Sequence, residues 1–479
     1  MQNPERTRHS ILAMTILAVL LCSSRFVLGQ QNGTDIVIGK RVPFASKIFN
    51  AEIALSIYLP PSYEAGATKY PVLYDLNAFT TFVHDAGAVD YLSAPGLSYL
   101  PEMIVVGVPF LPADYVPTPY EERDASPKAS DLILKFFREE LMPFIAGQYR
   151  TSGYNILSGH SVAGLFTTYA LFTQPDLFSA GIASSPWFQA RDQYWLKQID
   201  KMFQAESLAH KSLFMTVGKK EQGLTISTFT ELEKWMNSKD LKGLAWKTSW
   251  FDGVDHMSMI GRSLYDGLLF IFDGWQFPYD LLRSADIPAI EAYADKIRAK
   301  FGGLIEYRIP EDLLNAVVTD LCAEKSYDRA ADLSTLATKI YPNPWRAYFR
   351  IADIFMAKGD KVSAGKNYEL SVEKNPGQTE PEKIFLQVAK ARLDPKQVAA
   401  KKLKMYPGDY GIRKVFLENG VLTYQRSGPK LRLFPITETM FAVEGYDSFW
   451  LEFVLTDGKA TAVIGLYADG RREASPRVK

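Results

Sequence analysis

With 479 residues, the chain is longer than one ordinary hydrophobic core, and we expect two or three domains. Hydrophobic residues make up 47% of it, which is enough to bury sizeable cores. Lys plus Arg and Asp plus Glu number 54 each. This balance argues against a basic surface for nucleic acid and against an acidic surface for a cationic partner.

Residues 1–29 have the features of a secretory signal peptide. Arg6 and Arg8 precede an apolar run over 11–22, and Val-Leu-Gly ending at Gly29 offers a plausible cleavage point. A retained membrane anchor is the alternative, but the run has about 12 residues where a span needs about 20. We therefore expect a secreted or periplasmic protein with no stable membrane span after processing.

Over 34–276, strand-like and helix-like segments alternate, which predicts an α/β domain with a largely parallel sheet. The expected strands cover 52–59, 70–76, 102–108, 154–157, 180–183, 213–217 and 245–251. The expected helices cover 130–146, 162–173, 226–237 and 258–273.

The segment YNILSGHSVAG, from Tyr154 to Gly164, is the most informative motif of this domain. A short apolar run stops at Gly159-His160-Ser161 and continues into LFTTYALF, which has helical spacing. A strand that turns sharply into a helix around a central Ser is a nucleophile elbow, which lifts the hydroxyl clear of the sheet. The motif therefore predicts that Ser161 is the nucleophile of a serine hydrolase.

Ser161 needs a general base, because a neutral hydroxyl is a weak nucleophile. His256, in FDGVDHMSM, follows the last long strand, where the base lies in sites with the chain order Ser, acid, His. The sequence therefore predicts His256 as the base. The other four histidines are expected elsewhere. His9 belongs to the signal peptide, and the His160 side chain should point away from the Ser161 hydroxyl. We expect His210 on the surface and His84 in the wall of the cleft.

The third member of such a site is a carboxylate that holds the imidazole tautomer and offsets its charge. Glu221, in VGKKEQG, is the only acidic residue on the loop that follows the strand 213–217. Asp252 and Asp255 compete because they are close to His256 in sequence, and a dyad without an acid is a further alternative. Glu221 is the favoured acid.

The oxyanion of an acyl-transfer reaction needs two backbone N–H groups. Val162 follows the nucleophile at the helix N-terminus, and a second donor is expected after the strand 70–76, at Ala78 or Phe79. Trp187, Phe188 and Phe82 are candidate pocket walls that would suit an aryl or other bulky ester, although aromatic residues near strand ends are more often core. No cluster has metal-ligand spacing and no Gly-rich phosphate loop is present, so we expect no cofactor.

From 284 to 405 the strand signal vanishes and helical spacing takes over, with an internal repeat of 34 residues. Its two units resemble tetratricopeptide repeats, which suggests a protein partner; a plain helical array with no peptide-binding role is the alternative. The matching positions are Tyr348, Ile351, Ala352, Phe355, Ala364, Tyr368, Ser371 and Pro376, and Leu314, Val317, Val318, Leu321, Ala330, Ser334, Ala337 and Pro342.

Over 408–475 short alternating segments separated by turn residues predict a small antiparallel β domain. The expected strands cover 421–425, 431–435, 440–443, 450–455 and 462–467. This segment contains no His or Cys, and we expect no chemistry in it.

Four segments together resemble the putative esterase family that includes enterochelin esterases, the esterase D group and feruloyl esterases. They are IALSIYLPPSYEAGATKYPVLYDL from Ile53, SGHSVAGLFTTYALFTQPDLFSAGIASSPWF from Ser158, FMTVGKKE and DHMSMI. The resemblance covers most of 36–275 and implies an α/β hydrolase fold with Ser161 as nucleophile, Glu221 as acid and His256 as base.

Two positions depart from the family pattern. Ala163 stands where the G-x-S-x-G elbow has its second Gly, and Asn77-Ala78 replaces the Asp-Gly that typically ends the oxyanion strand. The tail from about Tyr410 is similar to a small β domain of some secreted bacterial hydrolases.

The favoured function is thus a secreted serine carboxylic ester hydrolase that works through an acyl-enzyme. An acyltransferase with the same residues, and a non-catalytic scaffold that carries the helical repeats, are the alternatives.

Overall fold

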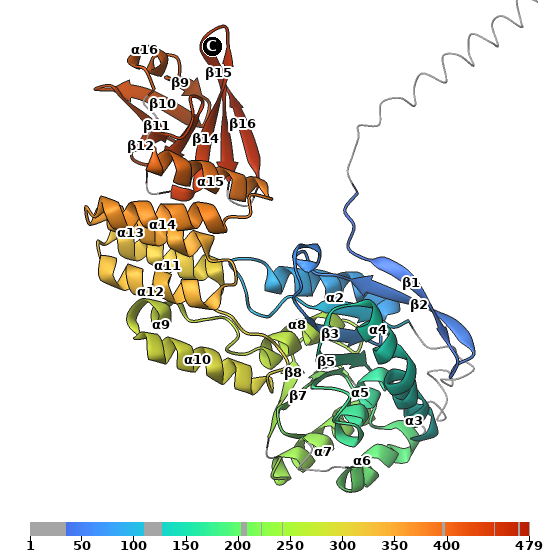
Figure 1. Cartoon of the computed structure of the whole chain (residues 1–479). Coiled ribbons are helices and arrows are strands. Elements are labelled where there is room, and N and C mark those ends of the chain that lie inside the picture. The colour runs from blue at the N-terminus through green and yellow to red at the C-terminus, as the bar shows by residue number, and fades with distance from the viewer. Residues whose placement is uncertain are drawn as a thin grey trace, which may run out of the picture.

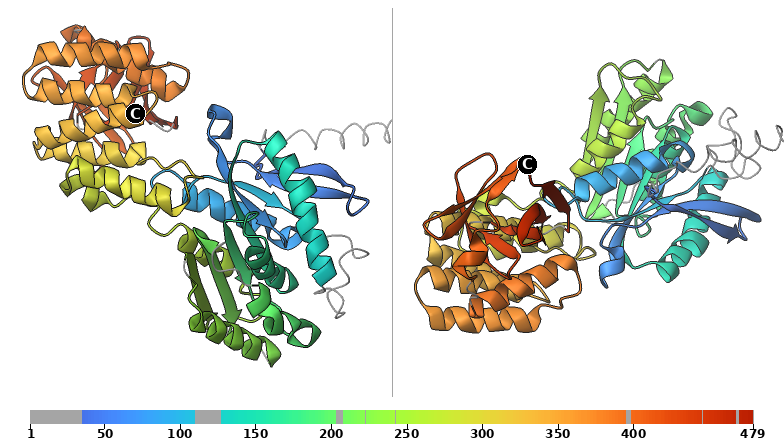
Figure 2. Two further views of the ribbon diagram at one scale, coloured as in Figure 1. Left: turned by 60° about the horizontal axis from the view of Figure 1, so that its bottom comes forward. Right: turned by 90° about the horizontal axis from the view of Figure 1, so that it is seen from above.

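The computed structural model describes residues 35–109, 127–202, 208–221, 223–241, 243–394, 398–444, 446–467 and 470–478. The predicted signal peptide, 1–29, lies outside these residues. Figure 1 shows an α/β part, a run of helices and a C-terminal β part, which follow one another along the chain. In both views of Figure 2 the orange and red C-terminal parts lie to one side of the α/β part.

An eight-stranded sheet forms the centre of the α/β part, in the order β1-β2-β4-β3-β5-β6-β7-β8. The pairs from β4 to β8 are parallel, whereas β1 pairs with β2 and β2 with β4 in the antiparallel sense. The expected α/β class and all seven expected strands are confirmed. The bounds are β1 Lys40–Ser46, β2 Ala51–Tyr58, β3 Tyr70–Asp75, β4 Ile104–Gly107, β5 Thr151–His160, β6 Ala180–Ser184, β7 Lys211–Gly218 and β8 Leu244–Phe251.

Helices cover both faces of this sheet. They are α2 Ala78–Ser93, α3 Pro127–Phe136, α4 Met142–Gln148, α5 Val162–Thr173, α6 Ala190–Met202, α7 Leu224–Ser238 and α8 Ile260–Ile271. The four expected helices are present, and the first of them contains a π-helical turn, Phe137–Leu141, between α3 and α4. Strand β1 and helices α2 and α6 were not expected from the sequence.

Helix α2 forms despite a weak local signal. Several β-branched residues and a glycine lower the helix propensity of its sequence, AFTTFVHDAGAVDYLS. Ala86, Val89 and Leu92 recur every three residues and are all fully buried in the core beneath the sheet. Burial of this face outweighs the propensity cost.

The core on the α2 and α8 face of the sheet continues into the helical part. It joins Leu73 and Tyr154 of the sheet to Phe301, Leu314 and Val317 of the following helices. Tyr307 donates a hydrogen bond from its hydroxyl to the Trp275 carbonyl at 2.9 Å. The first helices after the sheet therefore stabilise the α/β part, and they are not a separable appendage.

Between residues 311 and 393, each helix of the helical part packs against the next one along the chain. The helices of this part are α9 Tyr279–Ser284, α10 Ile287–Lys300, α11 Glu311–Ala323, α12 Tyr327–Ile340, α13 Trp345–Ala357, α14 Lys361–Lys374, α15 Glu380–Leu393 and α16 Ala400–Leu403. The starts of α11 and α13 lie 34 residues apart, as do those of α12 and α14. The tetratricopeptide interpretation and the expected domain boundaries stay predictions. No helix among the described residues is long and apolar enough to cross a bilayer.

The C-terminal part is an antiparallel meander in which the strands pair in chain order. The five expected strands are present, and β9, β10 and β16 add to them. The bounds are β9 Gly408–Tyr410, β10 Arg413–Glu418, β11 Val421–Gln425, β12 Leu431–Pro435, β13 Met440–Val443, β14 Tyr446–Thr456, β15 Lys459–Tyr467 and β16 Arg472–Pro476. A shared core joins Trp345, Phe349 and Phe385 of the helices to Trp450 of β14.

Phe301 offers a test of the coupling between the sheet and the helices. Its ring lies 5.5 Å from that of Tyr154 and 5.3 Å from that of Phe272, centroid to centroid. We expect Phe301→Ala to lower the free energy of unfolding of the α/β part by about 3–5 kcal/mol, because it leaves a cavity under the sheet. Leu304→Ala, at a side chain that is 44% exposed, should change it by less than about 0.5 kcal/mol. Equal effects of the two changes in urea unfolding would contradict the shared core.

Candidate active site

Ser161 lies at a sharp turn between β5 and α5. Its backbone has φ 58° and ψ −118°, and it precedes the first residue of the helix, Val162. The Ser161 N–H donates to the Ser184 carbonyl at 2.9 Å, and the Trp187 N–H donates to the Ser161 carbonyl at 3.0 Å. These two bonds fix the turn against the end of β6.

Close packing around the turn explains its two glycines. A Cβ at Gly159 would lie 2.4 Å from the Ala163 carbonyl oxygen, and one at Gly164 would lie 3.0 Å from the Ser184 carbonyl oxygen. After Ser161, the position that requires a glycine is therefore Gly164, one residue later than in the family pattern. Ala163 is half-buried against the core, so its methyl group is accommodated.

Glu221 and His256 come together at the same edge of the sheet as Ser161, because β5, β7 and β8 are parallel and each residue follows the carboxyl end of its strand. His256 Nδ1 lies 2.8 Å from Glu221 Oε2. The Glu221 side chain is 2% exposed and the His256 side chain 37%. Among the described residues, no hydrogen bond joins the Ser161 hydroxyl to His256.

Glu221 is held by three donors. Its Oε1 accepts the Gly218 N–H at 3.0 Å, and its Oε2 accepts the Ser185 hydroxyl at 2.6 Å as well as His256 Nδ1. Burial of the carboxyl favours its neutral form, but the hydrogen bonds to His256, Ser185 and Gly218 outweigh burial and keep its pKa below the usual value. Glu221 is thus an ionised acceptor for the imidazole.

The two competing carboxylates are engaged elsewhere. Asp252 is exposed and pairs with Lys219 Nζ at 2.9 Å. Asp255 Oδ1 accepts the Ser258 N–H at 2.9 Å and the Met257 N–H at 3.2 Å. Both therefore serve the loop that carries His256, and among the described residues neither forms a hydrogen bond with its ring.

Ser185 and His160 support His256, and neither role was predicted from the sequence. The Ser185 hydroxyl lies 2.9 Å from His256 Nδ1, in addition to its bond to Glu221. His160 Nε2 donates to the His256 carbonyl at 2.7 Å, and the two imidazole centroids are 4.4 Å apart. The His160 side chain thus holds the loop that carries His256.

Asn77 connects the loop after β3, where the second oxyanion donor is expected, to the elbow. Its Oδ1 accepts the His160 N–H at 2.7 Å, and its own N–H donates to Asp75 Oδ1 at 2.9 Å. Helix α2 begins at Ala78, so the N–H groups of Ala78 and Phe79 lie in its first turn, where such groups have no intrahelical acceptor. Val162 is in the same position at the start of α5.

The expected pocket walls have different surroundings. Trp187 is half-buried, and the Phe82 ring packs over Gly39. Phe188 is only 2% exposed and belongs to the hydrophobic core of the α/β part. The Phe79 side chain is 86% exposed.

The remaining histidines lie outside the Glu221–His256 pair. His84 Nδ1 lies 2.8 Å from Asp85 Oδ1, and its ring packs against Gly261. His210 is exposed in a turn with φ 60°. In the part of the chain that the structure describes, no three His, Cys, Asp or Glu side chains gather as metal ligands would.

His160 predicts a pH dependence of stability. Burial, and then the neighbouring His256, lower its pKa from 6.5 to about 4. Between these values the unfolded chain binds a proton that the folded chain does not, which favours unfolding. The part of the free energy of unfolding that depends on neutral His160 is therefore complete above pH 6.5 and is lost as the pH falls toward 4. We expect a loss of about 3 kcal/mol across this window. Urea unfolding of wild type and His160→Gln from pH 4 to 7.5 measures it; equal pH slopes for the two proteins would refute the assignment.

Comparison with known proteins finds esterases that the α/β part resembles. Residues 46–266 match the model of the family described as putative esterase. A siderophore enterobactin esterase of Emericella nidulans is 34% identical over 115 residues, which are 22% of this chain and 38% of that protein. A siderophore triacetylfusarinine C esterase of Aspergillus fumigatus is 26% identical over 174 residues, which are 31% of this chain and 60% of that protein. The chain thus spans less than two thirds of the length of each of these curated relatives.

Solved structures share the fold. An IroE-like serine hydrolase from Shewanella oneidensis matches with a TM-score of 0.53 and 22% identity, over 62% of this chain and 98% of that one. An uncharacterised protein from Capnocytophaga ochracea matches with a TM-score of 0.53 and 17% identity, over 74% of this chain and 99% of that one. The expected α/β hydrolase fold is confirmed. The α/β part of this chain therefore resembles the putative esterase family, whose model matches residues 46–266.

Proposed function

We propose that this chain is a serine carboxylic ester hydrolase with Ser161 as nucleophile, His256 as general base and Glu221 as the acid. The observation that carries the proposal is the 2.8 Å contact between His256 Nδ1 and Glu221 Oε2 at the sheet edge where the elbow also lies. The match of residues 46–266 to the putative esterase family supports the ester bond as the target.

In the proposed reaction, His256 Nε2 takes the Ser161 hydroxyl proton as the oxygen attacks the ester carbonyl. The Val162 N–H and an N–H from Ala78 or Phe79 stabilise the oxyanion. His256 then gives the proton to the leaving alcohol, which departs and leaves an acyl-serine. Water, deprotonated by His256, attacks this ester and releases the acid and the free serine.

Hydrolysis is favoured over acyl transfer to an alcohol because the His256 side chain is 37% exposed, so water can reach the acyl group. The sequence of 1–29 supports secretion or a periplasmic location as part of the proposal. Binding of a protein partner by the helical part stays a prediction from the sequence.

Ser161→Ala is the direct test of the nucleophile. We expect it to lower kcat/KM by several orders of magnitude, because the acyl-enzyme cannot form. Wild type and variant are compared on nitrophenyl esters of varied acyl chain, feruloyl esters and a siderophore trilactone. The trilactone is included because two relatives are named siderophore esterases. Ser238→Ala, at an exposed helix end, is the matched control and should keep full activity. Turnover that survives Ser161→Ala, or its absence from the wild type on every ester, would overturn the proposal.

Glu221→Gln tests the acid without changing the size of the side chain. We expect kcat to fall by about 10²–10⁴-fold, because a neutral amide neither fixes the imidazole tautomer nor stabilises the imidazolium. Asp252→Asn is the charge-matched control on the neighbouring loop and should act like wild type. Similar losses for the two variants would contradict the role of Glu221.

Ser185→Ala tests the hydroxyl that contacts both Glu221 and His256. We expect kcat/KM to fall by about three- to tenfold, because a single supporting hydrogen bond is worth about 1 kcal/mol. A loss as large as that of Glu221→Gln would show that Ser185 takes part in proton transfer directly.

A further inference from the structure

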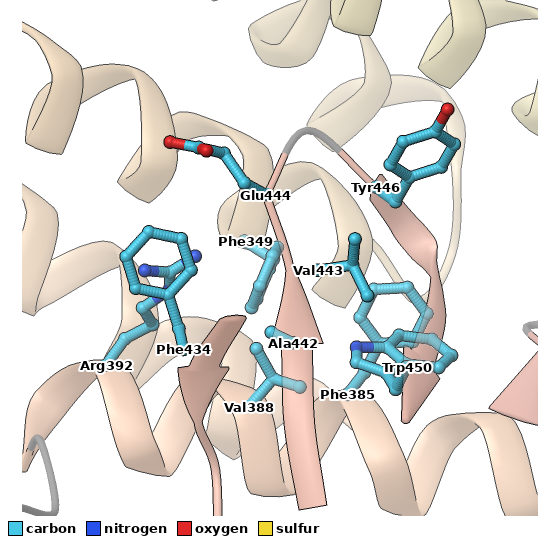
Figure 3. Close-up of a pocket in the computed structure, with 10 residues that line it drawn as sticks. All are labelled: Phe349, Phe385, Val388, Arg392, Phe434, Ala442, Val443, Glu444, Tyr446 and Trp450. Atoms are coloured by element: carbon cyan, nitrogen blue, oxygen red, sulfur yellow. The ribbon is translucent and has the colours of Figure 1, made fainter. Parts of the chain in front are cut away.

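A hollow of about 180 Å³ lies between the helical part and the C-terminal sheet, in the red and orange parts away from the proposed active site. Helix α15 and strands β12, β13 and β14 contribute most of its lining. Figure 3 shows Arg392 and Phe434 on one side and Phe385 and Trp450 on the other. The lining residues are Phe349, Phe385, Val388, Arg392, Phe434, Ala442, Val443, Glu444, Tyr446 and Trp450.

The inner wall of the hollow is aromatic and fixed. The Phe385 ring lies edge-on to Phe349, at 5.6 Å between centroids, and edge-on to Trp450, at 4.9 Å. Trp450 is 1% exposed and Phe349 2%. The core covers these two rings, so the aromatic surface that a guest can contact comes from half-buried Phe434 and from Phe385, which the core holds in place.

The rim of the hollow carries the guanidinium group of Arg392, which lies over an aromatic ring. The guanidinium lies 5.3 Å from the Phe434 centroid. Within the described part of the chain, Arg392 forms no ion pair with a carboxylate. Half-buried Arg392 therefore has its fork of N–H donors available to a ligand.

Glu444 is the described carboxylate that lines this rim. Its Oε2 already accepts the Arg432 backbone N–H at 3.2 Å. Among the described residues, Arg392 is the cation that lines this rim. It is therefore the group through which the hollow would bind an anion.

The size of the hollow limits the guest to about one ring. An engineered cavity of about 150 Å³ accepts benzene, whereas sites for drug-sized ligands have about 300 Å³ or more. We propose that the hollow binds a small carboxylic acid with one aromatic ring. The ring lies against Phe385 and Phe434, and the carboxylate accepts two parallel N–H bonds from Arg392. This site is independent of the proposed esterase activity.

Binding of 4-fluorobenzoate to the full chain, followed by fluorine NMR, tests the proposal. We expect a Kd of about 1 mM, typical for so few non-hydrogen atoms. The matched neutral probe, 4-fluorobenzamide, should bind at least about tenfold more weakly, because it lacks the charge that Arg392 recognises. No binding of the acid, or equal binding of acid and amide, would overturn the proposal.

Variants locate the binding. Arg392→Gln should weaken 4-fluorobenzoate at least about tenfold by removing the cation. Ala442→Leu should do the same by filling the hollow, and Val388→Met is a second filling variant should the first not fold. Lys390→Gln makes the same charge change at an exposed position of the same helix and should bind like wild type. If 4-fluorobenzoate binds Arg392→Gln and the folded filling variant as tightly as wild type, the site lies elsewhere and the inference is refuted.

Discussion

The turn at Ser161 is the constraint on which the rest of the site depends. A non-glycine residue with φ 58° and ψ −118° stores strain of about 1–3 kcal/mol. Packing and hydrogen bonds hold it there: Gly159 and Gly164 allow helix α5 to approach β5 and β6, and the Ser184 carbonyl accepts the Ser161 N–H. The strained turn keeps the hydroxyl of the proposed nucleophile at the helix N-terminus, where the first N–H groups can stabilise negative charge.

The loops after neighbouring strands are tied to this turn by hydrogen bonds that do not involve the Ser161 side chain. Asn77 accepts the His160 N–H, and His160 in turn donates to the His256 carbonyl. The loop of the proposed oxyanion donors, the elbow and the loop of the proposed base are therefore linked in one chain of contacts. With Nδ1 of His256 directed at Glu221, Nε2 is the nitrogen left for proton transfer. A buried neutral His160 beside it keeps a second positive charge out of the site.

Much of this arrangement was predictable because it depends on periodicity and chain order. The strands around Ser161, Glu221 and His256 are apolar runs bounded by turn residues, and a parallel sheet brings their carboxyl ends to one edge. Helix α2 was missed because its β-branched residues hide a face that only tertiary burial stabilises. The contacts of Ser185 and Asn77 were missed because a short polar side chain in a loop has no pattern that tells which distant group it reaches. Phe188 shows the opposite case: an aromatic residue near a strand end that the core buries.

Covalent labelling measures the central claim most directly. A fluorophosphonate transfers its phosphonyl group to a serine oxygen only where a base removes the proton and donors stabilise the charge, so it reports the assembled site without knowledge of the natural ester. Peptide mass spectrometry of the labelled full chain should find the adduct on Ser161, and His256→Asn should abolish it. An unlabelled Ser161, or labelling that persists unchanged in His256→Asn, would contradict the account.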